Sequence, residues 1–170
     1  KESVTLSEKG GALQSDLLQD VLKIAVVNRY FDAPPALGFV KNFGLKSGAI
    51  ASCVAHDSHN IIAVGTNDED ICEAINAIIR EKGGVSLANR EEILTVPLPV
   101  AGIMSHLDGY EVASAYEKLD RRAKELGAKL AAPYMTLSFC ALLVIPKLKL
   151  SDLGLFDGEN FSFTSLYNKS

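Results

Sequence analysis

The sequence contains no tryptophan, and only three histidines and three cysteines occur among its 170 residues. The thiols of Cys53, Cys72 and Cys140 are odd in number, lie among apolar neighbours and lack CxxC spacing. This pattern argues against a disulfide framework or a cysteine-ligated zinc site and favours small buried thiols. We therefore expect a protein of the reducing cytoplasm.

Dense cationic segments and long apolar runs are also missing. The formal net charge is −4, and lysine and arginine form no dense run. Nucleic-acid binding depends on clustered cations, so nucleic acid is not an expected partner. No apolar stretch approaches the roughly 18 residues of a membrane-spanning helix, and no charged-then-apolar leader opens the chain. We expect a soluble, unexported protein without a membrane partner. The sequence starts at Lys1 and not at a methionine, so it could be a piece of a longer chain.

Several motifs of nucleotide binding and catalysis do not occur. Neither GxGxxG nor GxxxxGK[ST] is present, so the binding of nucleotide phosphates has no support. The GxSxG motif of many serine hydrolases is missing too. The GTND segment at residues 65–68 could place free helix amides around an anion, but the acids that follow would repel phosphate. A helix cap is the better interpretation.

The residues that are present are typical of one globular domain. Hydrophobic residues make up 48% and charged residues 22% of the chain, and no linker rich in serine, proline or charge divides it. Residues 68–82 and 111–126 have the apolar spacing of amphipathic helices. Thr66 and Glu69 have capping-box spacing before the first helix, and Gly83-Gly84 suits its exit. Asp108 and Gly127 are expected to cap and to end the second.

Shorter apolar runs predict strands that are covered on both faces, at residues 49–55, 61–65 and 137–145. Residues 21–27 fit a strand or a helix, and their β-branched side chains favour a strand. Residues 85–87 and 93–96 flank a polar loop and predict a hairpin.

The remaining segments are rich in proline, glycine or turn residues. Residues 31–48 are expected to form a long loop, and the tail from Pro146 to wrap the surface or to form an edge strand. Together the segments predict an α/β (α+β layered) fold, a single domain in which a mixed β-sheet packs with two main amphipathic helices.

The segment VAHDSHNIIAVGTND holds the cluster with the most chemical potential. Its five consecutive polar residues are His56, Asp57, Ser58, His59 and Asn60. Turn-forming residues between two strand-like runs predict a hairpin turn at the end of a sheet, where functional side chains are often carried.

Different kinds of site would place different demands on this turn. A metal site would need a third ligand from elsewhere, and His106 is isolated in the sequence. A catalytic triad with Ser58 or Ser52 would lack its usual motif. Two alternatives stay open: a turn whose side chains only satisfy the backbone, and a site shared with another domain or subunit.

Three blocks follow one another along the chain: GAIASCVAHDSHNIIAVGTNDEDICEAIN, LPVAGIMS and APYMTLSFCALLVIPKLKLSDLGLFD. In this order they resemble the C-terminal domain of the bacterial adenine deaminases of the amidohydrolase superfamily. The similarity runs from about residue 21 to 163, the core of a single domain spanning residues 1–170. His106 and the APPA loop at residues 33–36 depart from the family pattern.

The resemblance implies a parent enzyme that hydrolyses adenine to hypoxanthine and ammonia with a metal-bound hydroxide. In such enzymes manganese or iron lies in an N-terminal (β/α)-barrel, and this sequence contains neither that barrel nor its HxH motif. The HxE and PCxxC motifs of the zinc-dependent base deaminases are missing too. We therefore expect no metal or cofactor in this chain, and an isolated domain without activity.

The resemblance also implies partners and a role for the turn. The N-terminal barrel would be the partner domain, adenine the substrate of the full enzyme, and a homo-oligomer is left open. Residues 56–60 match the family's HDSHN block and are expected at the active-site entrance or the barrel interface, with no catalytic proton assigned. The alternatives are a purely structural or oligomerisation domain, and a stand-alone small-ligand module with the APPA loop beside its site.

Overall fold

The computed structural model describes residues 1–167. Within these residues the chain forms eleven strands and three helices. The strands are β1 (Glu8–Lys9), β2 (Ala12–Leu13), β3 (Val21–Val27), β4 (Ala36–Lys41), β5 (Ala49–Ser52), β6 (Ile61–Gly65), β7 (Gly84–Ala88), β8 (Ile93–Pro97), β9 (Leu148–Ser151), β10 (Gly154–Asp157) and β11 (Ser162–Phe163). The helices are α1 (Asp68–Arg80), α2 (Gly109–Glu125) and α3 (Pro133–Phe139).

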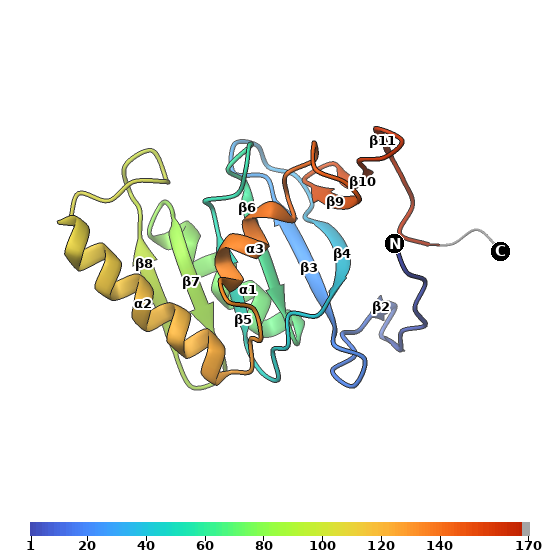
Figure 1. Ribbon diagram of the computed structural model, residues 1–170, viewed down its shortest axis with the longest axis horizontal. Coiled ribbons are helices and arrows are strands. Elements are labelled where there is room, and N and C mark those ends of the chain that lie inside the picture. The colour runs from blue at the N-terminus through green and yellow to red at the C-terminus, as the bar shows by residue number, and fades with distance from the viewer. Residues whose placement is uncertain (168–170) are drawn as a thin grey trace.

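The central sheet has the strand order β4-β3-β6-β5-β7-β8, and all its neighbouring strands are antiparallel. Helices α2 and α3 cover the face toward the viewer in Figure 1, and α1 lies behind the sheet. The layered α/β prediction is confirmed. The sheet is antiparallel rather than mixed, because short connections such as that between β7 and β8 join neighbouring strands directly.

The two faces of the sheet carry side chains of different size. Toward α2 and α3 the strands present large residues, among them Leu22, Ile24, Val26, Ile50, Ile62, Val64 and Leu87. Toward α1 they present mostly small ones, among them Ala25, Ala49, Ala51, Ala63 and Ala88. The strands are largely apolar because both faces of the sheet are covered. Large and small side chains therefore alternate along them, in place of apolar and polar ones.

Helix α1 begins one residue later than the predicted capping box implied. Asn67 is its N-cap, and the Asn67 side chain accepts a hydrogen bond from the Asp70 backbone amide at 2.8 Å. Thr66 lies outside the helix, where its hydroxyl donates to the Gly48 carbonyl at 3.2 Å. Thr66 was therefore the wrong cap, because its hydroxyl bonds a neighbouring loop instead of the helix.

Helix α2 has the predicted ends. Asp108 and Glu111 form a capping box, and Gly127 follows the last turn at φ +109°. Leu119 and Ala123 are its fully buried residues. The predicted strand at residues 21–27 is confirmed as β3, and the predicted hairpin as β7 and β8.

Two apolar segments were assigned wrongly from the sequence. Residues 137–145 were predicted as a strand, but α3 ends there and turns follow it. Pro133 at the first helical position favours α3, and a short apolar run does not distinguish a buried helix from a strand. Residues 31–48 were predicted as a loop but contain β4, which pairs with β3. Gly38 interrupts the apolar pattern of β4. A Cβ atom at this position would lie 3.6 Å from the Leu150 side chain.

The cysteines differ in exposure. Cys53 is buried and Cys140 half-buried, whereas Cys72 is exposed on the outer side of α1. The prediction of three buried thiols is therefore wrong for Cys72, which falls on the solvent side of an amphipathic helix. No helix within residues 1–167 has the length and apolarity needed to cross a membrane.

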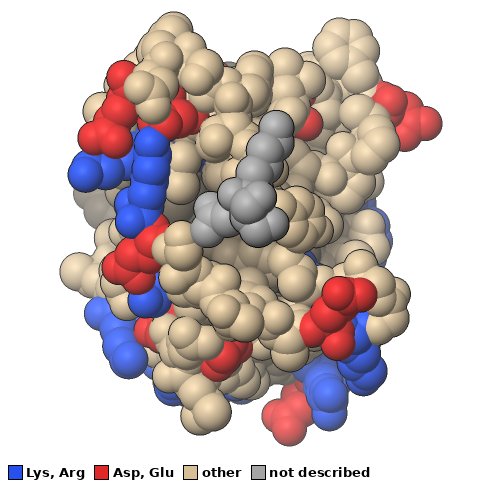
Figure 2. All heavy atoms as spheres, turned by 90° about the vertical axis from the view of Figure 1, so that its right-hand side faces the viewer, with Lys and Arg blue, Asp and Glu red and all other residues tan. Residues whose placement is uncertain are grey.

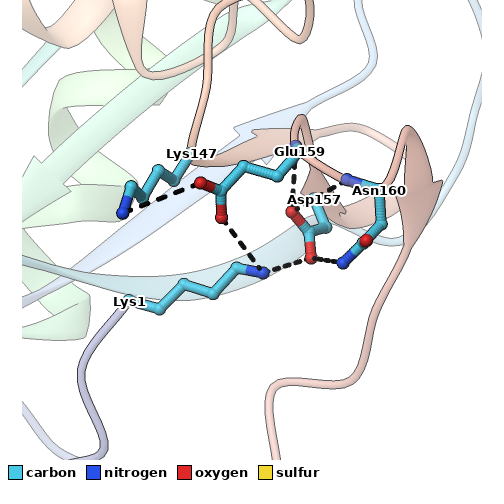
Figure 3. A network of polar contacts seen from close by, with 5 residues as sticks. All are labelled: Lys1, Lys147, Asp157, Glu159 and Asn160. Atoms are coloured by element: carbon cyan, nitrogen blue, oxygen red, sulfur yellow. Dashed lines mark hydrogen bonds and ion pairs between the residues drawn. The ribbon is translucent and has the colours of Figure 1, made fainter.

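The first residue of the chain contacts the hairpin of β9 and β10. Lys1 forms ion pairs with Asp157 and Glu159, and Asn160 donates to Asp157 at 2.8 Å (Figure 3). The hydrogen bond from Lys1 lowers the pKa of the Asp157 carboxyl to about 2. Figure 2 shows this side of the molecule, where cations and anions lie side by side around a mostly uncharged centre. Positive charge is therefore interspersed with negative charge on this face.

Candidate functional site

The HDSHN residues form the connection between β5 and β6 at one end of the central sheet. The two strands are paired up to Ser52 and Ile62, so the segment between them is a hairpin turn, as predicted. The turn is held internally, because the His59 amide donates to the Ala55 carbonyl at 2.7 Å.

The two histidines of the turn lie close together and are both half-buried. Their ring centroids are 6.3 Å apart, and the His56 ring packs on Phe139 of α3 at 5.4 Å. The His59 Nδ1 atom is buried, and within residues 1–167 it has no hydrogen-bond partner. A buried polar atom without a partner costs about 1–3 kcal/mol, and this atom is shielded by the domain's own residues.

The other three residues of the turn have separate positions. Asn60 is buried, and its side-chain oxygen accepts a hydrogen bond from the Arg29 backbone amide at 3.1 Å. Asp57 and Ser58 are exposed, and the Ser58 carbonyl accepts a hydrogen bond from the Tyr30 hydroxyl at 2.9 Å. Asn60 thus fixes the turn to the end of β3, whereas Asp57 and Ser58 face outward.

The described residues do not fit a metal centre. No group of three or more His, Cys, Asp or Glu side chains in residues 1–167 could hold a metal ion. His106 is exposed in the loop before α2. We therefore derive no catalytic step through a metal for this chain.

A catalytic triad has no geometric support either. In the described chain no histidine is hydrogen-bonded to the hydroxyl of Ser58 or Ser52; the Ser52 hydroxyl instead accepts from the Val54 amide at 3.0 Å. A triad requires its serine and histidine within hydrogen-bond reach.

Three loops meet at this end of the sheet, and we call them together the rim: residues 28–31, 54–60 and 98–104. The Arg29 guanidinium donates to the Ala101 carbonyl at 3.2 Å and to the Tyr30 hydroxyl at 3.1 Å. Because Tyr30 in turn donates to the Ser58 carbonyl, Arg29 and Tyr30 connect all three loops.

A buried thiol also holds the rim. Cys53 donates to the Gly102 carbonyl at 2.7 Å, and its sulfur accepts a hydrogen bond from the Gly84 amide at 3.0 Å. The thiol therefore ties the end of β5 to the start of β7 and to the third loop.

Large apolar side chains are exposed along the rim. Tyr30 is 57% exposed, Phe31 75%, Val100 43% and Met104 52%. Exposed apolar side chains that gather in one patch mark interaction sites more often than free surface. The sequence patterns did not mark Arg29 and Tyr30 as site residues, and the 98–104 loop was noted only within the LPVAGIMS block of the family resemblance. The one available signal at the first loop was an aromatic pair shortly after an apolar strand.

The fold and the rim define a three-layer α/β domain with a histidine-containing turn at one end of its antiparallel sheet. The family model of the adenine deaminase C-terminal domain matches residues 1–162. This chain therefore belongs to the adenine deaminase C-terminal domain family.

Relatives named adenine deaminase support this membership. The protein of Methanosarcina acetivorans is 54% identical over 159 residues, which are 94% of this chain and 29% of that protein. The protein of Sulfurovum sp. is 59% identical over 152 residues, 89% of this chain and 28% of that protein. The protein of Salinibacter ruber is 50% identical over 169 residues, 98% of this chain and 31% of that protein. The chain thus spans less than a third of the length of these relatives.

Proposed function

We propose that this domain belongs to an enzyme that hydrolyses adenine to hypoxanthine and ammonia, and that the rim packs against the rest of that enzyme. The observation that supports the proposal is the set of exposed apolar side chains on the rim, Tyr30, Phe31, Val100 and Met104. Family membership supplies the reaction, and the relatives supply a region that could cover the rim.

The division of labour follows from what the described residues can supply. They could hold no metal ion, so the manganese or iron that the family resemblance implies would be carried by the rest of the enzyme. The part of this domain would be to complete the wall of the site and to exclude water from it, using Tyr30, Phe31 and Met104. Such an enzyme would act in purine metabolism in the cytoplasm.

The experiment compares two histidine variants of the full-length protein. We expect His59→Ala to lower kcat/KM for ammonia release from adenine by about tenfold, since a shifted turn would misplace the rim against the rest of the enzyme. His106→Ala is the control, because His106 is exposed and outside the rim. If both variants keep the kinetic constants of the parent, the turn has no part in the reaction.

A purely structural role is the second candidate, and the exposed apolar side chains of the rim favour it. In that case substitutions in the turn would change the melting temperature or the assembly of the full-length protein and leave turnover unchanged. A melting curve of His59→Ala beside the kinetics separates the two roles. A stand-alone ligand module is the third, and a melting temperature unaffected by any purine would count against it.

A further inference from the structure

The fold holds the Arg29 side chain in a seat formed by the adjacent Tyr30 and by the loop of Ala101. Its guanidinium donates to the Ala101 carbonyl and the Tyr30 hydroxyl, and its central carbon lies 5.1 Å from the centre of the Tyr30 ring. Two hydrogen bonds and one ring contact fix the direction of the planar group. Such a guanidinium is pre-organised to bind a planar acceptor.

Glycines make room for this seat. A Cβ atom on Gly102 would lie 1.6 Å from the Arg29 Nη1, and one on Gly83 would lie 2.3 Å from the Gly102 Cα. Any larger residue at position 102 would therefore expel the guanidinium. Gly102 itself is held in place by the hydrogen bond from Cys53. The local backbone is thus built around the Arg29 head group.

The seat leaves the charge of Arg29 without a counter-ion. No carboxylate of residues 1–167 forms an ion pair with Arg29. A guanidinium has five N–H donors, and two of them are used by Ala101 and Tyr30. The remaining donors are free to bind an acceptor that approaches the rim.

We propose that Arg29 binds an aspartate or glutamate carboxylate from the part of the full-length protein outside this chain. The inference rests on the proposed packing of the rim. Arg29 is the sole lysine or arginine of residues 28–31, 54–60 and 98–104, and Asp57, their sole acidic residue, forms no ion pair with it. One charge matches a carboxylate, whereas a phosphate dianion needs several donors and cations. The exposed Tyr30, Phe31 and Met104 around it would shield the pair from water.

The test is amide hydrogen exchange on the full-length protein, with attention to peptides outside this chain. We compare Arg29→Gln, which removes the charge, and Arg29→Lys, which keeps the charge but loses the paired N–H donors of the planar guanidinium. Arg90→Gln is the matched control, because Arg90 is exposed at the opposite end of the sheet. We expect both Arg29 variants to speed exchange by about tenfold in one outside peptide that contains an acidic residue, and Arg90→Gln to change none.

Each other outcome overturns the proposal. If the Arg29 variants change only residues 28–31 and 98–104, the seat is structural and binds nothing outside. The Arg29 variants could also change exchange in the outside peptide only after inorganic phosphate is added to an anion-poor buffer. In that case Arg29 binds a free anion instead of a carboxylate. Hydrogen exchange does not depend on turnover. A wild-type protein that fails to deaminate adenine would therefore refute the proposed function, and the exchange data would still test the role of Arg29.

Discussion

Asn67 is the residue at which α1 begins, and its side chain supplies the hydrogen bond that the first turn of the helix otherwise lacks. We expect Asn67→Ala to lower the free energy of unfolding by about 1 kcal/mol. Glu69→Gln is the control, because Glu69 is exposed and makes no cap contact; we expect a loss of a few tenths of a kcal/mol. Urea denaturation of both variants measures this. Equal losses would show that Asn67 is not the effective cap.

At the same scale, the candidate site shows which residues a sequence can reveal. The five polar residues of the turn were predicted together because they are consecutive and lie between two apolar strands. Arg29 was missed because its partner Ala101 is 72 positions away, and Tyr30 bonds Ser58 across 28 positions. Such contacts are created by the pairing of strands, which no local pattern contains.

At the scale of elements, sequence patterns located five of the six strands of the central sheet and the two long helices, because their apolar patterns are strong and the helix ends carry cap residues. The failures share a physical cause. The helix α3 has only seven residues and exposes Met135 and Phe139, so its short apolar run sets no clear helical period. In β4, Gly38 packs against Ile24 and Leu150 without a side chain of its own, and this breaks the alternation that marks a strand. In both cases tertiary packing decided the local structure.

At the scale of the whole molecule, the network of Lys1 and Asp157 joins the first residue to the β9–β10 hairpin (Figure 3). The folded protein holds the pKa of Asp157 at about 2, below its ordinary value of 3.8, chiefly through the hydrogen bond from Lys1. The stabilisation is therefore complete above the unfolded value and is lost as the pH falls through the folded value.

Asp157→Asn tests this coupling. We expect the difference in unfolding free energy between the parent and the variant to be constant above about pH 5 and to shrink toward about pH 2. The pKa values of Glu2 and Asp16 are also lowered, by hydrogen bonds from Lys41 and Gln19, so the parent alone would show a mixture of effects. A difference that did not change with pH would mean that Asp157 acts without its charge.

The central claim is that the rim is covered in the full-length protein, and thiol labelling tests it most directly. Ser58→Cys places a probe on the rim, and Ser47→Cys places a matched probe at the opposite end of the sheet; both serines are exposed in this domain. The background is Cys72→Ser, which removes the exposed native thiol. We predict that the probe at position 58 reacts at least about tenfold more slowly than that at position 47, because a packed interface excludes reagent. Equal labelling rates would contradict the account.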